Sequence, residues 1–198
     1  ELREILRGEW SRDVFMCIGG RANHGKSALL SKMAYEIALN NKDVCVIYHT
    51  IDDTLQQLLP RFVCIAEGST ELTQNMVRQP GYWVKERGLK FIDKARSKGY
   101  KIIRKLAQEG KLMIKDISHG ESLSFAENLI SYYQEQYPDR RIVYILDNIH
   151  KLRDFEAKDE RVRNKIVSEA CKNLALRKRI TILGSVEYTK MPPGTKPS

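Results

Sequence analysis

Residues 20–27 have the types and the spacing of a phosphate-binding loop. They read GRANHGKS and match the pattern G-x-x-x-x-G-K-[ST] in full. Glycines allow the backbone to curl so that successive N–H groups face inward and cradle an anion. In this pattern Lys26 can reach the β- and γ-phosphates of ATP, and the Ser27 hydroxyl can bind Mg²⁺. The sequence therefore predicts a site for ATP and magnesium.

We expect this loop to contact the nucleotide along its whole length, with Lys26 also acting in catalysis and Ser27 binding the metal. His24 has no partner at the spacing of metal ligands, so it is interpreted as a loop residue only. The predicted nucleotide contacts are Gly20, Arg21, Ala22, Asn23, His24, Gly25, Lys26, Ser27 and Ala28.

A carboxylate directly follows another apolar run. Asp147 comes after residues 142–146, which read IVYIL. Such a pattern is typical of a Walker B aspartate, which holds Mg²⁺ through water and so contributes to the nucleotide site. The alternative is an aspartate that caps a helix or closes a turn. With the phosphate loop present, the metal role is favoured.

A second pair of acids, Asp52 and Asp53, lies just past the apolar residues 44–48. A carboxylate in this place can orient or deprotonate the water that attacks the γ-phosphate. Two acids before a helix can equally be an N-terminal cap. We favour Asp52 as the catalytic base, with Asp53 as the alternative.

The elements that must position these residues alternate along the chain. Apolar runs typical of strands are separated by segments of helical periodicity, which predicts βαβ units. We therefore expect an α/β fold with a mostly parallel sheet and helices on both faces, and ligands at the carboxyl ends of its strands. The predicted strands are residues 13–18, 44–48, 112–114, 142–146 and 180–183, and the predicted helices are 26–40, 55–66, 123–137 and 161–177.

Two of these helical segments carry further predictions. In residues 26–40, five apolar side chains fall on one stripe that should face the sheet. Residues 69–110 are polar and mostly helical, and we expect breaks at Pro80-Gly81 and at Gly99. The five side chains of the stripe are Leu29, Leu30, Met33, Ile37 and Ala38.

Composition narrows the class of protein. The chain has 198 residues, of which 42% are hydrophobic, enough for a folded core, but no apolar run approaches the ~20 residues of a membrane helix. Its net charge of +9 favours a polyanionic partner, although a solvated basic surface is the alternative. The four cysteines lack paired spacing, so neither zinc nor disulfides are indicated, and a cytoplasmic location is expected.

Several of these motifs together resemble the C-terminal ATPase domain of the DnaB-like replicative helicases, a RecA-like family of P-loop NTPases. That family shows Ser-Leu-Glu-Met followed by Gln-Leu and Arg at the spacing found here, and the resemblance runs from about Val14 to the last residue. It rests on the phosphate loop, Thr50-Ile51-Asp52-Asp53, Gln57-Leu58, Arg61, Ile145-Leu146-Asp147-Asn148 and Glu187-Tyr188-Thr189-Lys190.

The resemblance implies a hexameric ring that hydrolyses ATP at its subunit boundaries and translocates on single-stranded DNA, with primase and a helicase loader as possible partners and no role for a membrane. Residues 1–12 would be a lead-in or linker, and residues 13–198 a RecA-like ATPase domain that is incomplete at its C-terminus. Such a fragment is expected to bind nucleotide and to hydrolyse it poorly.

Three residues depart from the family pattern. Asp52 is one methylene shorter than the family's catalytic Glu. Glu187, which the resemblance places beside the nucleotide, stands where the family has a Gln that senses the γ-phosphate. Lys190 stands where Arg is usual, and it could pair with Glu187.

The resemblance also places a DNA-facing loop at residues 150–158, where Lys151, Arg153 and Lys158 could follow phosphates without reading bases. Acids within the loop dilute its charge, so a solvated loop is the alternative. Tyr82-Trp83, next to Lys85 and Arg87, could stack on a base or on a neighbouring subunit, but burial in the chain's own core is favoured.

Other functions share the phosphate loop. The first alternative is another RecA-like ATPase, such as a recombinase or a clock-type switch, in which hydrolysis regulates assembly. The second is a P-loop kinase of small molecules, which would need an acceptor pocket. The third is a binding module that uses ATP only to hold its shape.

Overall fold

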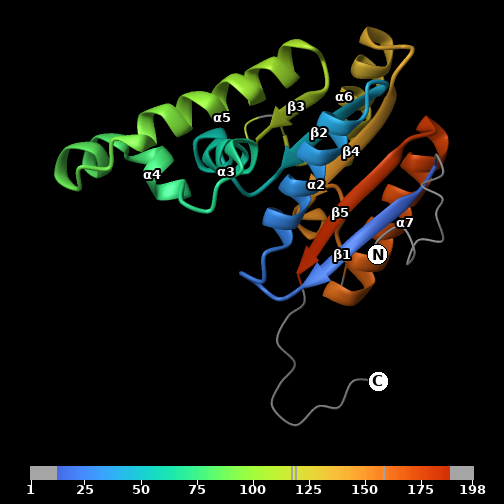
Figure 1. The fold of residues 1–198 in the computed structure, drawn as a ribbon. Helices are drawn as coiled ribbons and strands as arrows, with labels where there is room; N and C mark the ends of the chain where they lie inside the picture. The colour runs from blue at the N-terminus through green and yellow to red at the C-terminus, as the bar shows by residue number, and fades with distance from the viewer. Residues whose placement is uncertain (1–12, 117, 119, 158, 188–198) are drawn as a thin grey trace, which may run out of the picture.

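The computed structural model describes residues 13–116, 118, 120–157 and 159–187. Within them, five parallel strands form one sheet in the order β1-β5-β4-β2-β3, so the predicted fold class is confirmed (Figure 1). Each predicted strand is present and extends further at its carboxyl end than predicted. The strands are β1 (Phe15–Gly20), β2 (Val44–Thr50), β3 (Leu112–Lys115), β4 (Arg141–Asp147) and β5 (Thr181–Glu187).

Helices cover both faces of this sheet. Side chains of α2, α3 and α5 form one apolar core with the strands, and side chains of α6 and α7 form another on the opposite face. Figure 1 shows α2 in front of the strands and α7 behind them. The helices are α2 (Lys26–Asn40), α3 (Leu55–Glu67), α4 (Gln74–Arg78), α5 (Phe91–Gln108), α6 (Leu123–Gln136) and α7 (Glu160–Lys178), with a π-helical turn η1 (Tyr82–Glu86) and a 3₁₀ turn η3 (Ile149–Lys151).

The two central strands are buried on both faces. Every residue of β2 is buried, and so is every residue of β4 except the first. This explains why both strands read as continuous apolar runs rather than as an alternating pattern. Only polar residues with a hydrogen-bonding role are expected in such strands, because an unpaired buried polar group is costly.

The carboxyl ends of the strands meet at one edge of the sheet. Gly20, the last residue of β1, is aligned with Glu187 of β5. Thr50, the last residue of β2, is aligned with Asp147 of β4. The phosphate loop leaves β1 at this edge and enters α2, so the predicted site residues of four strands lie together there, as expected for an α/β sheet.

The segment between α3 and β3 forms a helical lobe that lies to one side of the sheet in Figure 1. The chain leaves the helical conformation at Gln79, directly before Pro80-Gly81, so α4 and η1 are separated one residue earlier than predicted. The break predicted at Gly99 is wrong, because this residue lies in the interior of α5. A Cβ built on Gly99 would lie 2.5 Å from the Val63 carbonyl oxygen, so the glycine lets α5 approach α3 closely.

No helix among the residues described here is both long and apolar enough to cross a membrane. The predictions for residues 1–12, for Lys158 and for residues 188–198 lie outside the described residues.

Candidate nucleotide-binding site

The phosphate loop curls tightly before α2. Asn23 and Gly25 both have positive φ angles, of 61° and 81°, and the His24 N–H donates to the Arg21 carbonyl oxygen at 3.3 Å. Lys26 is 8% exposed, and its ammonium donates to the same carbonyl oxygen at 2.8 Å. The lysine therefore lies across the loop, where a bound phosphate would meet it.

The first turn of α2 suits an anion. No side chain caps this helix within the described residues, and no acid occupies its first turn. The first N–H groups of a helix have no partner inside the helix and form the positive end of its dipole. Together with the curled loop and Lys26, they provide donors for phosphate oxygens.

This loop opens onto a cleft of about 390 Å³, within the size range of small-molecule sites. Nine of the predicted nucleotide-site and catalytic residues line it, and they come from the loop, from the end of β2 and from the end of β5. Gly20, Arg21, His24 and Asp147 were predicted for this site but do not line the cleft. The lining residues are Ala22, Asn23, Gly25, Lys26, Ser27, Ala28, Asp52, Asp53, Arg61, Gln74, Asn148 and Glu187.

Asp147 is buried, at 1% exposure, among hydroxyl groups. The Tyr48 hydroxyl donates to its Oδ2 at 2.7 Å, and the Ser185 hydroxyl donates to its Oδ1 at 2.5 Å. The side chain thus binds two hydroxyls, one from each neighbouring strand. Charge-assisted hydrogen bonds of this kind fix the orientation of a buried carboxylate.

A chain of polar contacts joins Asp147 to the phosphate loop. Ser31, one turn along α2, lies with its hydroxyl 3.3 Å from the Tyr48 hydroxyl and 2.7 Å from the Ser27 carbonyl oxygen. Burial and the negative charge of Asp147 raise the pKa of the Tyr48 phenol well above its ordinary value. Tyr48 therefore keeps its proton and remains a donor to Asp147.

The acids after β2 are not the cap of α3. That position belongs to Thr54, whose N–H donates to the Gln57 side chain at 2.9 Å. Asp53 instead lies 3.5 Å from the Arg61 guanidinium. The carboxylate of Asp52 accepts hydrogen bonds from the Asn148 amide and from the Lys151 ammonium.

Asn148 has an unusual backbone. Its φ of 37° lies in the left-handed region, which costs free energy for a residue with a side chain. In this conformation the side chain contacts Asp52, and its amide oxygen lies 3.1 Å from the Ser185 hydroxyl, whose hydrogen it shares with Asp147. Asn148 thereby connects the end of β2 to the end of β5.

Glu187 lines the cleft beside the phosphate loop, as the alignment of β5 with β1 requires. His150 lies near enough to Glu187 for the charge of the glutamate to affect the pKa of the histidine. Burial lowers the pKa of His150, an effect that the charge of Glu187 opposes. Lys190, the predicted partner of Glu187, lies outside the described residues.

Two of the three predicted DNA-contacting residues are described, and both form ion pairs. Lys151 contacts Asp52, and Arg153 contacts Glu121. Their side chains remain 48% and 79% exposed, so both can still reach a ligand in solvent. Lys158, the third, is outside the described residues.

The backbone around these residues is held by Arg163 of α7. Its guanidinium donates to the carbonyl oxygens of His150, Leu152 (at 2.5 Å) and Phe155 (at 2.9 Å). The segment after β4 is thus fixed in its main chain while its basic side chains project outward.

Tyr82 and Trp83 pack edge to face, with ring centroids 5.3 Å apart. Trp83 packs against the small core formed by α3, α4 and α5, as favoured from the sequence. Tyr82 is 46% exposed and lies under the Arg87 guanidinium, so burial was the wrong prediction for this residue.

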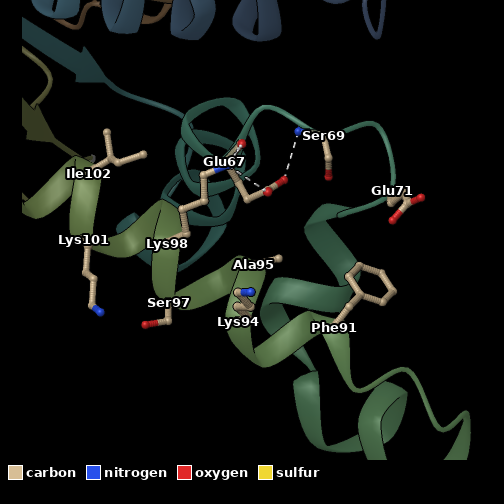
Figure 2. A pocket seen from close by; sticks show the side chains of 10 residues that line it. All are labelled: Glu67, Ser69, Glu71, Phe91, Lys94, Ala95, Ser97, Lys98, Lys101 and Ile102. Atoms are coloured by element: carbon tan, nitrogen blue, oxygen red, sulfur yellow. Dashed lines mark hydrogen bonds and ion pairs between the residues drawn. The ribbon is translucent and has the colours of Figure 1, made fainter.

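A larger cavity, of about 710 Å³, lies in the helical lobe and contains none of the predicted site residues. Figure 2 shows it between the end of α3, the loop that follows and α5. Lys94, Lys98 and Lys101 line its α5 side, and Lys98 donates to the Glu67 carbonyl oxygen at 2.8 Å.

Some polar residues of the site were not predicted from the sequence. Ser31 follows Ser27 by four residues, a spacing that places both on one face of a helix. Ser185 is a polar residue inside an apolar strand, which is a signal for a hydrogen-bonding role. Nothing in the sequence marks Gln74, since it reaches the cleft only through the packing of α4.

The residues fit a nucleotide with magnesium. The cleft contains the loop, Lys26 and Ser27, and Asp147 lies behind Ser31 and Tyr48. Among the described ranges, no group of three or more His, Cys, Asp or Glu side chains could hold a metal by itself. Proteins usually bind Mg²⁺ through one or two side chains, phosphate oxygens and water, and Ser27 and Asp147 are of the types that could supply the side chains.

No family model matches the chain, and no curated protein matches it in sequence. Solved structures do match it. A DnaB-like replicative helicase, whose structure was described with its interactions with primase, has a TM-score of 0.71 at 18% identity, and the match covers 90% of this chain and 39% of that chain. A second solved structure, of an ATPase domain, has a TM-score of 0.73 at 18% identity, and the match covers 91% of this chain and 59% of that one.

The chain has the RecA-like fold of these ATPase domains. At 18% identity the likeness shows the fold alone. The chain also spans only about two fifths and three fifths of the lengths of the two matching chains. Fold alone does not determine function, which depends on the site that the fold carries.

Proposed function

We propose that this chain is the ATP-binding and ATP-hydrolysing motor domain of a hexameric replicative DNA helicase that translocates on single-stranded DNA. The observation that carries the proposal is the cleft itself. It combines Lys26, Ser27 and other residues of the phosphate loop with a carboxylate from the end of β2, so that phosphate donors and a candidate base face one space. The likeness to helicase ATPase domains supports the choice among P-loop proteins.

In this proposal the loop amides and Lys26 hold the β- and γ-phosphates. Ser27 and, through water, Asp147 hold Mg²⁺, which neutralises charge on the phosphate oxygens when it is bound. Tyr48 and Ser185 keep the carboxylate of Asp147 in place. The N-terminus of α2 adds the field of its dipole to the same phosphates.

Asp52 is the proposed base. It accepts a proton from a water molecule while the water oxygen bonds to the γ-phosphorus and the bond from that phosphorus to the bridging oxygen of ADP breaks. Both acids are ion-paired, Asp53 with Arg61 and Asp52 with Lys151, so pairing does not separate them; Asp52 is preferred because it also contacts Asn148, the residue directly after Asp147. Glu187 adds negative charge to the cleft, and this charge would repel the phosphates of a nucleotide that carries no metal ion. Glu187 is therefore proposed as a nucleotide contact that favours nucleotide with bound metal.

Lys151, Arg153 and Lys158 are proposed to contact the phosphates of single-stranded DNA, because the two described side chains project from one clamped segment. A homo-oligomeric ring, with primase or a loader as a further partner, is proposed by analogy with the helicase that matches the fold. A cytoplasmic location follows from the same proposal.

The test compares ATP hydrolysis by the full-length protein with and without single-stranded DNA, and strand separation on a forked substrate. We expect DNA to stimulate hydrolysis, and Asp52→Asn to lower kcat by about 10²–10⁴-fold, the usual contribution of a general base.

The Asp53→Asn variant is the matched control and is expected to keep most of the activity. Loss in Asp53→Asn alone would move the base to Asp53. Hydrolysis without strand separation would indicate a recombinase or a switch, and phosphate transfer to a small acceptor would indicate a kinase. If the protein did not bind nucleotide, the helicase, the recombinase or switch, and the kinase would all be contradicted.

A further inference from the structure

Both carboxylate oxygens of Asp52 are engaged by one short segment of the chain. Asn148 donates to Oδ2, and Lys151 donates to Oδ1. These two residues follow β4, nearly a hundred positions away from Asp52 in sequence. An ammonium group on a carboxylate oxygen occupies one of its lone pairs and the space beside it, which the attacking water would otherwise use.

The two contacts differ in how firmly they are held. Asn148 is 8% exposed, and its amide oxygen lies 3.1 Å from the Ser185 hydroxyl, whose hydrogen it shares with Asp147. The Lys151 side chain is 48% exposed and ends on a carboxylate whose side chain is 28% exposed. Ion pairs exposed to this degree are weak, because water screens them and both side chains lose freedom.

The main chain at Lys151 is held independently of its side chain. The Lys151 N–H donates to the Asn148 carbonyl oxygen at 3.1 Å, and Arg163 binds the carbonyl oxygens on both sides, those of His150 and Leu152. The ammonium can therefore leave Asp52 by rotation of its side chain, without any unfolding of the segment.

A polyanion would compete for this ammonium. Each lysine placed on a phosphate of nucleic acid releases a condensed counterion, a gain that the pair with Asp52 does not offer. Arg153, two residues further on and 79% exposed, would attract the same strand. After Lys151 leaves, the hydrogen bond from Asn148 would remain. It would keep the Asp52 side chain directed at the segment after β4.

We infer that Lys151 is a positioning residue that restrains Asp52, and that nucleic-acid phosphate releases the carboxylate by taking the lysine ammonium. In the absence of nucleic acid, Lys151 occupies Oδ1 and slows hydrolysis. When a strand binds, Oδ1 becomes free to accept the proton of the attacking water. This inference rests on the proposed function, in which Asp52 is the base.

The test is the rate of ATP hydrolysis by the full-length protein carrying Lys151→Ala, without and with single-stranded DNA. We expect the DNA-free rate to rise by about fivefold, the factor that loss of one partly exposed ion pair can produce. We expect stimulation by DNA to fall toward unity. Lys151→Arg should keep the restraint, because it keeps the charge and the reach of the side chain.

A double-mutant cycle shows whether the effect passes through Asp52. In an Asp52→Asn background, measured in single-turnover experiments, Lys151→Ala should change the rate by less than about twofold. The matched control is Lys165→Ala, an exposed lysine 3.9 Å from Glu169 on α7 and outside the site, which should leave all rates unchanged.

Three results would overturn the inference. A lower DNA-free rate in Lys151→Ala would make the lysine a direct contributor to catalysis. An unchanged DNA-free rate with weaker stimulation would make it a DNA contact only. A raised rate in a protein that DNA does not stimulate would remove the nucleic-acid trigger.

A wild-type protein that does not hydrolyse ATP would instead contradict the proposed function. Thermal unfolding of each variant separates all of these results from loss of fold.

Discussion

Tyr48 shows how one buried hydroxyl can organise the site. It lies on β2, is fully buried, and connects Ser31 of α2 with Asp147 of β4. The phosphate loop could be predicted from its motif. This connection could not, because residues 44–48 indicate only an apolar strand. Which side chains a buried tyrosine meets depends on the order of the strands, and β2 lies beside β4 rather than β1.

Replacing Tyr48 with Phe removes the hydroxyl and keeps the ring. We expect the free energy of unfolding to fall by about 1–3 kcal/mol, because the buried carboxylate of Asp147 loses a hydrogen-bond donor. We also expect the concentration of Mg²⁺ that half-saturates nucleotide binding to rise by about tenfold, since partners that orient a metal-binding group commonly have effects of this size. Urea denaturation and a magnesium titration with a fluorescent ATP analogue measure the two quantities.

Tyr144→Phe provides the control. Tyr144 is also fully buried, and its hydroxyl lies 2.6 Å from His49 Nδ1 rather than near Asp147. This variant should lose stability to a similar extent and keep the magnesium dependence of the wild type. Equal magnesium shifts in the two variants would show that Tyr48 acts through the core and not through Asp147.

At the scale of elements, periodicity located the helices better than it located their buried faces. The bounds predicted for α2 were residues 26–40, as observed, but Leu29, assigned to the buried stripe, is 45% exposed. The fully buried apolar positions are Leu30, Ala34 and Ala38, at successive turns of the helix. The orientation of α2 is constrained by Lys26 and Ser27, which must face the cleft, and this constraint rotates the helix away from its most apolar stripe.

Gly99 is a second case in which local sequence was an incomplete guide. A glycine inside a helical segment predicts a break by propensity alone. The structure explains its presence by packing. An alanine Cβ here would lie 2.5 Å from the Val63 carbonyl oxygen and 2.8 Å from Val63 Cγ1. Because these contacts involve backbone as well as side chain, the helices α3 and α5 must move apart to accept even one methyl group.

We expect Gly99→Ala to lower the free energy of unfolding by about 1–2 kcal/mol, because overpacking costs more than the ~1 kcal/mol that alanine gains in helix propensity. Gly81→Ala is the control, since Gly81 has helical backbone angles and no atom within 4 Å of the added methyl group. It should be neutral or slightly stabilising. Chemical denaturation of both variants would contradict this account if Gly99→Ala were the more stable of the two.

On the scale of the whole molecule, cations line several cavities among the described residues, and the cleft and the cavity of the lobe are two of them. The cleft at the strand ends has Lys26, a curled loop and a helix N-terminus, whereas the larger cavity of the lobe has the three lysines of α5 (Figure 2). Volume alone would favour the lobe. Convergent backbone donors favour the cleft, because a triphosphate needs several donors held in place before it arrives.

Thermal unfolding with Mg²⁺ and a non-hydrolysable ATP analogue separates these alternatives. A ligand that binds only the folded state at a hundred times its Kd adds about 2.7 kcal/mol of stability. For a chain of 198 residues this corresponds to a rise in Tm of roughly 5–10 °C. We expect that rise in the wild type, a much smaller one with a chelator present, and almost none in Lys26→Ala. The double variant Lys94→Ala/Lys101→Ala should respond like the wild type, and if it alone lost the response, the nucleotide would belong to the helical lobe and the cleft would need another ligand.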